Sequence, residues 1–375
     1  MGELLGKCVG LISQDEWRTL RSITETSFRH KTAEDYIPYI EQKMKTYFDG
    51  LNSHGILNRG FLDPVEDLKL LPFWIVSHII YGELSTEMED ELRRLIPLRE
   101  SVFRRIIAGG ITRFWWSRYL PLMIVNDLRK FKKAWSTFNE HAHQRAIEKN
   151  GSAQIIRLYE ALDSGTLTRD QMLQTLDEIL FANLDVTMGG ISWILVFLAA
   201  NRNSQNDLRE EIKKRSPTES DREEWNRYLL SASTLLAASI NESSRLRPLA
   251  AFSVPQAVPT DRVVGGFFIP AGTNFMVDSY ALNNNSSFWG DDSTTFRPTR
   301  FFEYDRIKSR YNFWRFGFGP RTCMGKYIAD LMIRILVVHV VQKYELGLVP
   351  ETSAWEKNKE TWITHPDTVL KCERL

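Results

Sequence analysis

The most informative stretch of the sequence is Phe316-Gly-Phe-Gly-Pro-Arg-Thr-Cys-Met-Gly325, which runs directly into a long apolar segment. The apolar segment predicts a helix from about Met324 to Tyr344, so Cys323 is expected at the N-terminus of that helix. Glycines at positions 317 and 319 allow positive φ angles and let the backbone approach a bulky ligand closely. The stretch therefore predicts a loop that presents a cysteine to a ligand.

The surroundings of Cys323 favour a deprotonated sulfur. Free amides at the start of a helix, the helix dipole and the nearby Arg321 all stabilise a thiolate. A soft, anionic sulfur in an apolar shell suits iron, and thiolate ligation of haem iron promotes cleavage of an O–O bond. The alternative is a buried structural cysteine beside a glycine-rich loop, the usual role of an isolated cysteine. The pattern of the whole loop favours the iron ligand.

This loop resembles the Phe-Gly-x-Gly-x-Arg-x-Cys-x-Gly signature of the cytochrome P450 family of haem-thiolate monooxygenases. Every fixed position is matched, by Phe316, Gly317, Gly319, Arg321, Cys323 and Gly325. The resemblance implies a cofactor, haem b (iron protoporphyrin IX), with Cys323 as the axial ligand of the iron. It also implies that Arg321 pairs with a haem propionate and that Phe316 shields the sulfur.

A second resemblance concerns a pair of charged segments. Glu242-Ser-Ser-Arg245 resembles the Glu-x-x-Arg helix of the family, and residues 296–301 resemble the segment whose arginine, here Arg300, completes a buried Glu-Arg-Arg cluster. Residues 242 and 245 share one helix face and can form an ion-paired network that fixes the cysteine loop. On its own, a Glu-x-x-Arg pair is more often a solvated surface pair. The order and spacing relative to Cys323 favour the buried cluster.

The N-terminal part of the chain carries a third resemblance. Trp17-Arg-Thr-Leu-Arg21 resembles the Trp-x-x-x-Arg helix that contacts haem propionates in the family. The spacing places Trp17 and Arg21 on one helix face, where both can donate to a carboxylate, although an ordinary amphipathic pair has the same spacing. In the family this helix follows a membrane anchor, part of the main sheet and a loop over the substrate pocket. We therefore expect a chain without those parts, either a fragment or a natural short form.

The helix expected to activate oxygen departs from the family motif, Ala/Gly-Gly-x-Asp/Glu-Thr-Thr/Ser. The corresponding stretch is Ala182-Asn-Leu-Asp-Val-Thr187. Asp185 matches the acid, whereas Asn183 replaces the glycine and Val186 replaces the first threonine. Proton delivery to bound dioxygen needs an acid and a hydroxyl or a water in relay. Asp185 with Thr187, Asn183 or a water could supply such a relay, and Asp185 and Thr187 are the predicted catalytic residues.

The rest of the sequence predicts a mainly α protein with a minor antiparallel β-sheet, which corresponds to the cytochrome P450 fold without its N-terminal part. After Arg245, short β-type runs alternate with turn signals up to about Asp278. No internal repeat or low-complexity linker occurs, so we expect residues 1–375 to form a single cytochrome P450 domain. The expected helices cover residues 14–28, 33–51, 64–81, 86–108, 120–148, 153–162, 169–201, 204–214 and 222–246.

Composition excludes several other classes of protein. The chain has 375 residues, of which 43% are hydrophobic and 25% charged, as in an ordinary folded protein. Its 48 Lys and Arg balance 47 Asp and Glu, which leaves no global charge for binding nucleic acid. Cys8, Cys323 and Cys372 are too few for a disulfide framework and indicate a reducing, intracellular compartment. The charge-free apolar stretches 186–201 and 70–82 are shorter than the roughly 18 apolar residues of a membrane span.

Together these features predict an oxidoreductase that inserts one oxygen atom from dioxygen into an apolar small molecule. The motifs around residues 296–298 and 314–316 suggest a fungal enzyme of secondary metabolism. Because the sequence lacks a dinucleotide fingerprint, an NADPH-dependent flavoprotein reductase is the expected electron donor. With Val186 at the usual threonine, oxidative coupling, cyclisation or rearrangement is one alternative reaction. A truncated, non-catalytic haem-binding pseudoenzyme is another.

The remaining expectations concern a membrane contact, the cellular location, metal sites and the contacts to substrate. Residues 111–120 interleave aromatic residues with arginines, a mixture that suits contact with a membrane surface or packing between helices. If the full-length form is anchored, the expected location is the cytoplasmic side of the endoplasmic reticulum. The seven histidines are scattered and provide no joint metal site. Apolar contacts to substrate are expected from Phe181, Ala182, Val186, residues 249–252 and residues 362–364.

Overall fold

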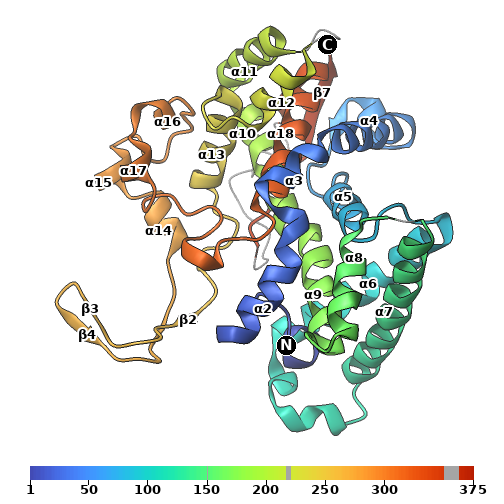
Figure 1. Ribbon diagram of the computed structural model, residues 1–375. Coiled ribbons are helices and arrows are strands. Elements are labelled where there is room, and N and C mark those ends of the chain that lie inside the picture. The colour runs from blue at the N-terminus through green and yellow to red at the C-terminus, as the bar shows by residue number, and fades with distance from the viewer. Residues whose placement is uncertain (150, 217–220, 350–362) are drawn as a thin grey trace. The chain divides into compact units, whose positions relative to one another are not determined.

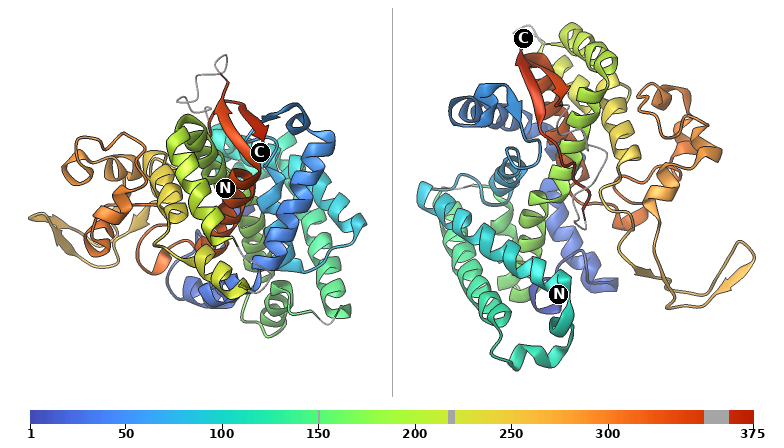
Figure 2. Two further views of the ribbon diagram at one scale, coloured as in Figure 1. Left: turned by 90° about the horizontal axis from the view of Figure 1, so that it is seen from above. Right: turned by 180° about the vertical axis from the view of Figure 1, so that it is seen from behind.

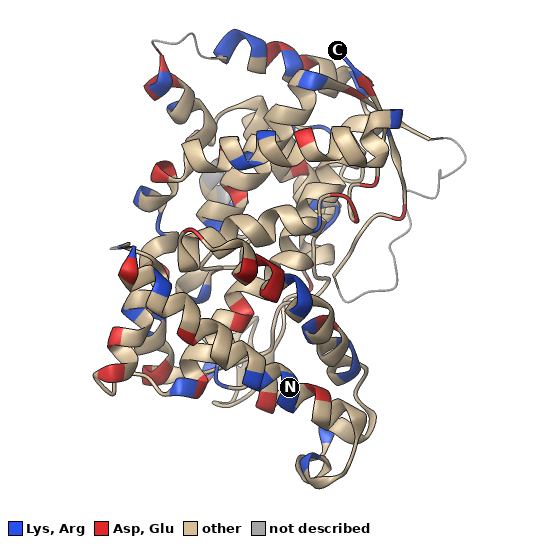
Figure 3. Ribbon diagram, turned by 90° about the vertical axis from the view of Figure 1, so that its right-hand side faces the viewer, with Lys and Arg blue, Asp and Glu red and all other residues tan. Residues whose placement is uncertain are grey.

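The computed structural model describes residues 1–149, 151–216, 221–349 and 363–375 (Figure 1). The chain divides into two compact units. The first unit consists of residues 1–32 and 70–184, and the second of residues 33–69 and 185–375. Trp362, one of the predicted substrate contacts, lies outside the described residues. Acidic and basic residues are interspersed along the helices (Figure 3).

The first unit is helical in its described part. Its longest helices are α6 (Thr86–Ala108) and α7 (Met123–Glu148), which pack against each other. The other elements are α1 (Gly2–Leu5), α2 (Gln14–Thr24), η1 (Glu25–Phe28), α5 (Leu70–Tyr81), η3 (Gly110–Arg113), η4 (Trp115–Tyr119), α8 (Gln154–Asp163), α9 (Arg169–Phe181) and η5 (Ala182–Leu184). Helix α3 (His30–Asp35) contains the boundary between the two units.

Aromatic residues form the core of the first unit. The ring of Phe181 at the end of α9 lies 5.6 Å from that of Phe73, 5.9 Å from that of Phe131 and 5.4 Å from that of Trp135, measured between centroids. The pairs with Phe131 and Trp135 are edge-to-face, an arrangement that adds to the stability gained from burial. Phe181 is only 2% exposed, so the structure places this predicted substrate contact within the core.

The second unit is built around two apolar helices that contact each other, α10 (Val186–Ala200) and α18 (Lys326–Lys343). Helices that are apolar on most of their surface are stable only when other elements cover them. Here α4, α11 and α13 contact α18. The remaining helical elements are α4 (Ile37–His54), η2 (Ile56–Arg59), α11 (Arg202–Arg215), α12 (Arg222–Leu230), α13 (Leu235–Leu246), α14 (Ser279–Asn283), α15 (Ser286–Trp289), α16 (Arg300–Glu303), α17 (Arg306–Ser309) and η6 (Gly319–Arg321).

All the strand pairs described in the second unit are antiparallel. Strands β1 (Phe61–Leu62), β7 (Leu370–Arg374) and β6 (Tyr344–Leu348) form one sheet in that order. Strand β2 (Gln256–Ala257) pairs with β5 (Asn274–Phe275), and β3 (Arg262–Val264) pairs with β4 (Phe267–Ile269). The β3–β4 hairpin extends away from the helices of its own unit (Figures 1 and 2). Gly265 and Gly266 form its turn with φ angles of 57° and 84°, which a type I′ turn requires.

The predicted fold class, mainly α with a minor antiparallel sheet, is confirmed, but some predicted boundaries were wrong. The expected helix 169–201 breaks after α9, because the side-chain amide of Asn183 donates to the carbonyls of Ile179 (2.7 Å) and Leu180 (3.3 Å). The expected helix 222–246 breaks between α12 and α13, where Thr234 caps the second helix. The C-terminal β6–β7 pairing was not predicted, and the assignment of one domain to residues 1–375 stays a prediction.

One stretch of consecutive helical elements, Arg169–Ala200, is long and apolar enough to cross a membrane by length and composition. Within its most apolar window, 78% of the residues are buried inside the protein. A core helix passes the same test, so this stretch alone is weak evidence for a membrane span.

Candidate active site

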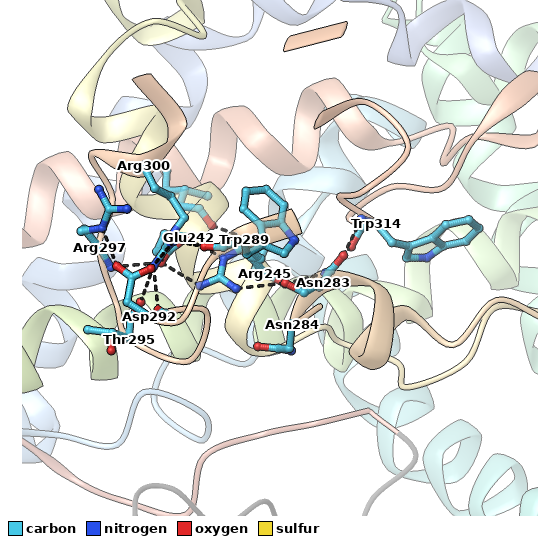
Figure 4. Close-up of polar contacts among 12 residues, drawn as sticks. Glu242, Arg245, Asn283, Asn284, Trp289, Asp292, Thr295, Arg297, Arg300 and Trp314 are labelled. Carbon is cyan, nitrogen blue, oxygen red and sulfur yellow. Dashed lines mark hydrogen bonds and ion pairs between the residues drawn. The ribbon is translucent and has the colours of Figure 1, made fainter. Parts of the chain in front are cut away.

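Glu242, Arg245 and Arg300 form a fully buried charged cluster in the second unit (Figure 4). Helix α13 places Glu242 and Arg245 three residues apart on one face, and Arg300 begins α16. Arg245 donates from Nε (2.8 Å) and Nη2 (2.9 Å) to the two oxygens of Glu242, and Arg300 Nε donates to Oε1 at 2.9 Å. Charges without solvent contact persist only when they are paired and hydrogen-bonded, as these are. The structure thus brings together the three residues predicted for this cluster.

Backbone carbonyls satisfy the remaining donors of Arg300. Its Nη1 donates to the carbonyl of Trp289 at 3.0 Å, and its Nη2 donates to the carbonyl of Asp292 at 2.9 Å (Figure 4). The carboxylate of Asp292 accepts hydrogen bonds from Arg300 and Arg297, which lower the pKa of Asp292. The cluster therefore fixes residues 289–300 as well as α13.

Asn283 connects this cluster to the chain that enters the cysteine loop. Its backbone carbonyl accepts from Arg245 Nη1 at 2.9 Å. Its side chain accepts from the backbone N–H of Trp314 at 2.6 Å and donates to the carbonyl of the same residue at 2.8 Å (Figure 4). The Asn283 side chain is completely buried. Sequence reasoning missed this residue.

A second polar cluster lies next to the loop and was also missed. Arg315 pairs with Asp330 of α18 at 2.6 Å and donates to Asn241 of α13 at 3.0 Å. Asp330 also accepts from Arg334 Nε at 2.7 Å. Burial alone would raise the pKa of Asp330, but the two guanidinium groups outweigh it and lower that pKa. Because Arg315 precedes the loop and Asp330 follows it, the ion pair ties together the two ends of the loop.

Within the loop, the backbone N–H of Cys323 donates to the carbonyl of Phe316 at 2.8 Å. Gly317 and Gly319 have φ angles of 82° and 70°, the left-handed conformation that glycine adopts without strain. Cys323 is exposed, and helix α18 begins only at Lys326. The predicted start of that helix at Met324 was therefore two residues too early, and the cysteine lies just ahead of the helix.

Asp185 and Thr187 lie at the start of α10. Asp185 is the half-buried N-cap residue, with φ −117° and ψ −56°, and Thr187 is 7% exposed. The carbonyl of Asp185 accepts from the backbone N–H of Gly189 and lies 2.9 Å from Nε2 of His365. His365 was not a predicted site residue.

Trp17 and Arg21 are half-buried residues of α2 in the first unit. Arg21 Nε pairs with Glu25 at 3.0 Å, one helical turn further along. The cysteine loop belongs to the second unit, so a shared role of Trp17 and Arg21 with Cys323 stays a prediction.

The fold and the loop agree with comparisons to known proteins. The sequence profile described as Cytochrome P450 matches residues 5–372. This chain belongs to the cytochrome P450 family. Cytochrome P450 monooxygenase aclC of Aspergillus oryzae is 50% identical over 376 residues, which cover 99% of this chain and 76% of that protein. Cytochrome P450 monooxygenase asaD of Aspergillus flavus is 45% identical over 374 residues, or 100% of this chain and 72% of that protein.

A solved zebrafish cytochrome P450, determined with abiraterone, has the same fold, with a TM-score of 0.76 at 17% identity. The match covers 100% of this P450 and 86% of the zebrafish chain. The predicted resemblance to fungal cytochrome P450 monooxygenases of secondary metabolism is thus confirmed, and the protein is an oxidoreductase. Membership of the family implies a thiolate-ligated haem.

The residues around Cys323 fit such a group. The cysteine is exposed and supplies the soft donor that iron accepts. A Cβ atom added at Gly319 or Gly325 would meet no other atom within 4 Å, so the loop has open space beside its backbone. Arg321 is half-buried within the same loop. Donor, space and nearby positive charge therefore occur together in one loop of this P450.

Proposed function

We propose that this P450 inserts one oxygen atom from dioxygen into an apolar small molecule of fungal secondary metabolism. The observation that carries the proposal is an exposed cysteine in a loop whose two ends are tied to buried ionic clusters. A ligand residue must be held rigidly if it is to bind a metal group in one geometry. The loop of this P450 has that support on both sides of Cys323.

Each predicted residue has a proposed role. The sulfur of Cys323 would bind the iron of haem b, Arg321 would pair with a propionate, and Phe316 would shield the sulfur. The haem, when bound, supplies the chemistry of dioxygen activation. Asp185 and Thr187 would hold and transfer the protons that this reaction consumes, since an acid and a hydroxyl lie at the start of one helix.

Apolar side chains at the start of α10 support an apolar substrate. In the second unit, Val186 begins α10 and is half-buried, as is Leu249. Of the predicted contacts in the first unit, Ala182 is exposed and Phe181 is confined to the core. Sites that bind small apolar molecules are lined mostly by such side chains. Val186 also favours a second candidate function, oxidative coupling or rearrangement, because it supplies no hydroxyl for a proton relay.

Turnover under ¹⁸O-labelled dioxygen tests the proposed reaction. The purified P450 would be supplied with NADPH, a fungal flavoprotein reductase and a panel of apolar fungal metabolites. Insertion predicts products that carry one ¹⁸O atom and that are absent with Cys323→Ala. Products without ¹⁸O would support coupling or rearrangement, and no product from a haem-loaded protein would support the pseudoenzyme.

We further propose that the NADPH-dependent reductase meets this P450 at a membrane, on the cytoplasmic side of the endoplasmic reticulum. The supporting surface is η4 and its neighbours in the first unit, where Trp115 is 73% exposed, Tyr119 68% and Phe114 51%. Arg118 lies over the rings of Trp115 and Tyr119. Aromatic residues mixed with arginines suit the lipid–water interface.

Flotation with vesicles of phosphatidylcholine and phosphatidylserine tests this membrane contact. The double variant Trp115→Ala/Tyr119→Ala is expected to reduce the vesicle-bound fraction several-fold. Ile307→Ala, which alters an 81% exposed residue of the second unit, is the matched control and should leave binding unchanged. Equal binding by all three proteins would contradict the proposal.

A further inference from the structure

Residues 363–365, which precede the last strand, pack directly against the first turns of α10. The carbonyl of Thr364 accepts from the indole Nε1 of Trp193 at 3.0 Å. The backbone N–H of Thr364 donates to the carbonyl of Leu249 at 2.9 Å. Ile363 is 2% exposed and His365 is 6% exposed, so the segment is buried where it meets the helix.

The contact depends on a glycine in α10. A Cβ atom at Gly189 would lie 2.8 Å from Cδ2 of Leu249, 3.1 Å from the carbonyl oxygen of Thr364 and 3.3 Å from Cγ2 of Ile363. A separation of 2.8 Å essentially never occurs for a real Cβ atom, and the other two are tight, so a side chain here would displace its neighbours. The absence of a side chain at 189 lets the C-terminal segment come close enough to reach the helix start.

At this place His365 Nε2 lies 2.9 Å from the carbonyl oxygen of Asp185. A carbonyl oxygen only accepts, so Nε2 must carry the proton and donate it. This bond fixes the tautomer and the orientation of the ring. The same carbonyl accepts the N–H of Gly189 at 2.9 Å, which closes the first turn of α10.

We propose that His365 is a positioning residue for Asp185. Asp185 follows the helix break at 182–184 and has φ −117° and ψ −56°, so its own backbone is at the edge of the regular helix. A donor on its carbonyl restrains ψ of Asp185 and thereby limits the movement of the backbone from which the carboxylate projects. His365 thereby fixes the acid that the proposed function uses for proton delivery, and the inference rests on that function.

Two substitutions of His365 distinguish the effect of its N–H donor from the effect of its size. His365→Gln retains an N–H group that can reach the carbonyl of Asp185, whereas His365→Leu fills the space without a donor. We expect His365→Leu to lower the product formed per NADPH consumed about tenfold, since small displacements of catalytic groups have effects of this size or larger. His365→Gln should restore most of the loss. His365→Met is a second variant without a donor if the leucine variant loses haem.

A double-mutant cycle tests whether His365 acts through Asp185. If it does, adding His365→Leu to Asp185→Asn should lower product formation by less than twofold, because the acid is already lost. A further tenfold fall in the double variant would overturn the proposal. The ferrous-CO spectrum of each variant should be the same as that of the parent protein. If the parent protein itself lacked the spectrum of a thiolate-ligated haem, the proposed function would be contradicted instead.

Hydrogen exchange provides a readout that does not depend on turnover. The amide of Gly189 donates to the carbonyl that His365 also contacts, so exchange in the peptide 186–193 should accelerate several-fold in His365→Leu. Exchange in His365→Gln should match the parent protein. Equal exchange in all three proteins, or a glutamine variant as impaired as the leucine variant, would refute the role of the donor.

Discussion

The buried carboxylate of Glu242 allows a sharp test of what supports the cysteine loop. It accepts four hydrogen bonds, two from Arg245, one from Arg300 and one from the backbone N–H of Arg297. Replacing Glu242 by Gln keeps the size of the side chain but removes the charge and turns an N–H group toward the guanidinium donors. Arg245 and Arg300 would then be buried without the carboxylate that now pairs with both of them.

The expected loss is large relative to the stability of a folded domain. Removing one partner of a buried ion pair costs about 3–5 kcal/mol, against a total of roughly 5–15 kcal/mol for a typical protein. The ratio of folded to unfolded protein should fall about 10²- to 10⁴-fold, since 1.4 kcal/mol is a factor of ten. The loop is tied to this cluster through Asn283, so haem retention should fall with stability.

Urea unfolding followed by circular dichroism, together with haem content, measures both effects. Glu303→Gln is the matched control, because Glu303 also pairs with an arginine, Arg297, but its side chain is 54% exposed. An exposed pair of this kind contributes at most about 1 kcal/mol. A change below about 1 kcal/mol in Glu242→Gln, or an equal change in both variants, would refute the reasoning.

Three further outcomes follow from individual side chains. The pKa of Asp330 is lowered in the folded protein, so its ion pairs stabilise the fold fully above about pH 4, the ordinary carboxyl range. This stabilisation is lost as the pH falls through the pKa of Asp330 in the folded protein. Urea titrations at pH 3–7 should show that Asp330→Asn lacks this acid-sensitive part of the stability. Gly189→Ala should destabilise the protein by about 1–3 kcal/mol in thermal melts, because its Cβ meets Leu249 and a backbone oxygen. Burial raises the pKa of Asp177 to about 6 even beside Arg99, so stability should decline as the pH rises from about 4 to about 6, and Asp177→Asn should flatten this slope.

Local sequence patterns predicted the parts of the site that lie within one segment. Glu242 and Arg245 are three residues apart, so helical periodicity alone places them on one face. The loop around Cys323 carries its glycines and cysteine in ten consecutive residues. Features of this kind depend on backbone geometry, which neighbouring residues determine.

Contacts between distant segments could not be predicted in this way. Asn283 reaches Trp314 across 31 residues, and Asp185 meets His365 across 180 residues. Neither pairing leaves a periodic signal, because each depends on tertiary packing. The scattered histidines gave no indication that one of them approaches the helix start.

The helix break before Asp185 shows an intermediate case. The sequence revealed that Asn183 replaces a glycine of the family motif, but periodicity still predicted a continuous helix. The break arises because the asparagine amide binds the carbonyls of Ile179 and Leu180. Asparagine competes with the backbone for hydrogen bonds, so this departure from the motif was the available signal.

The central claim, that Cys323 binds haem iron as a thiolate, is tested most directly by the ferrous-CO absorption spectrum. The purified chain would be compared with Cys323→Ala and Cys323→His. The account predicts the red-shifted Soret band of a thiolate-ligated haem in the parent protein and its loss in both variants. Absence of haem from the parent protein, or a Soret band that is the same whatever residue occupies position 323, would contradict the account.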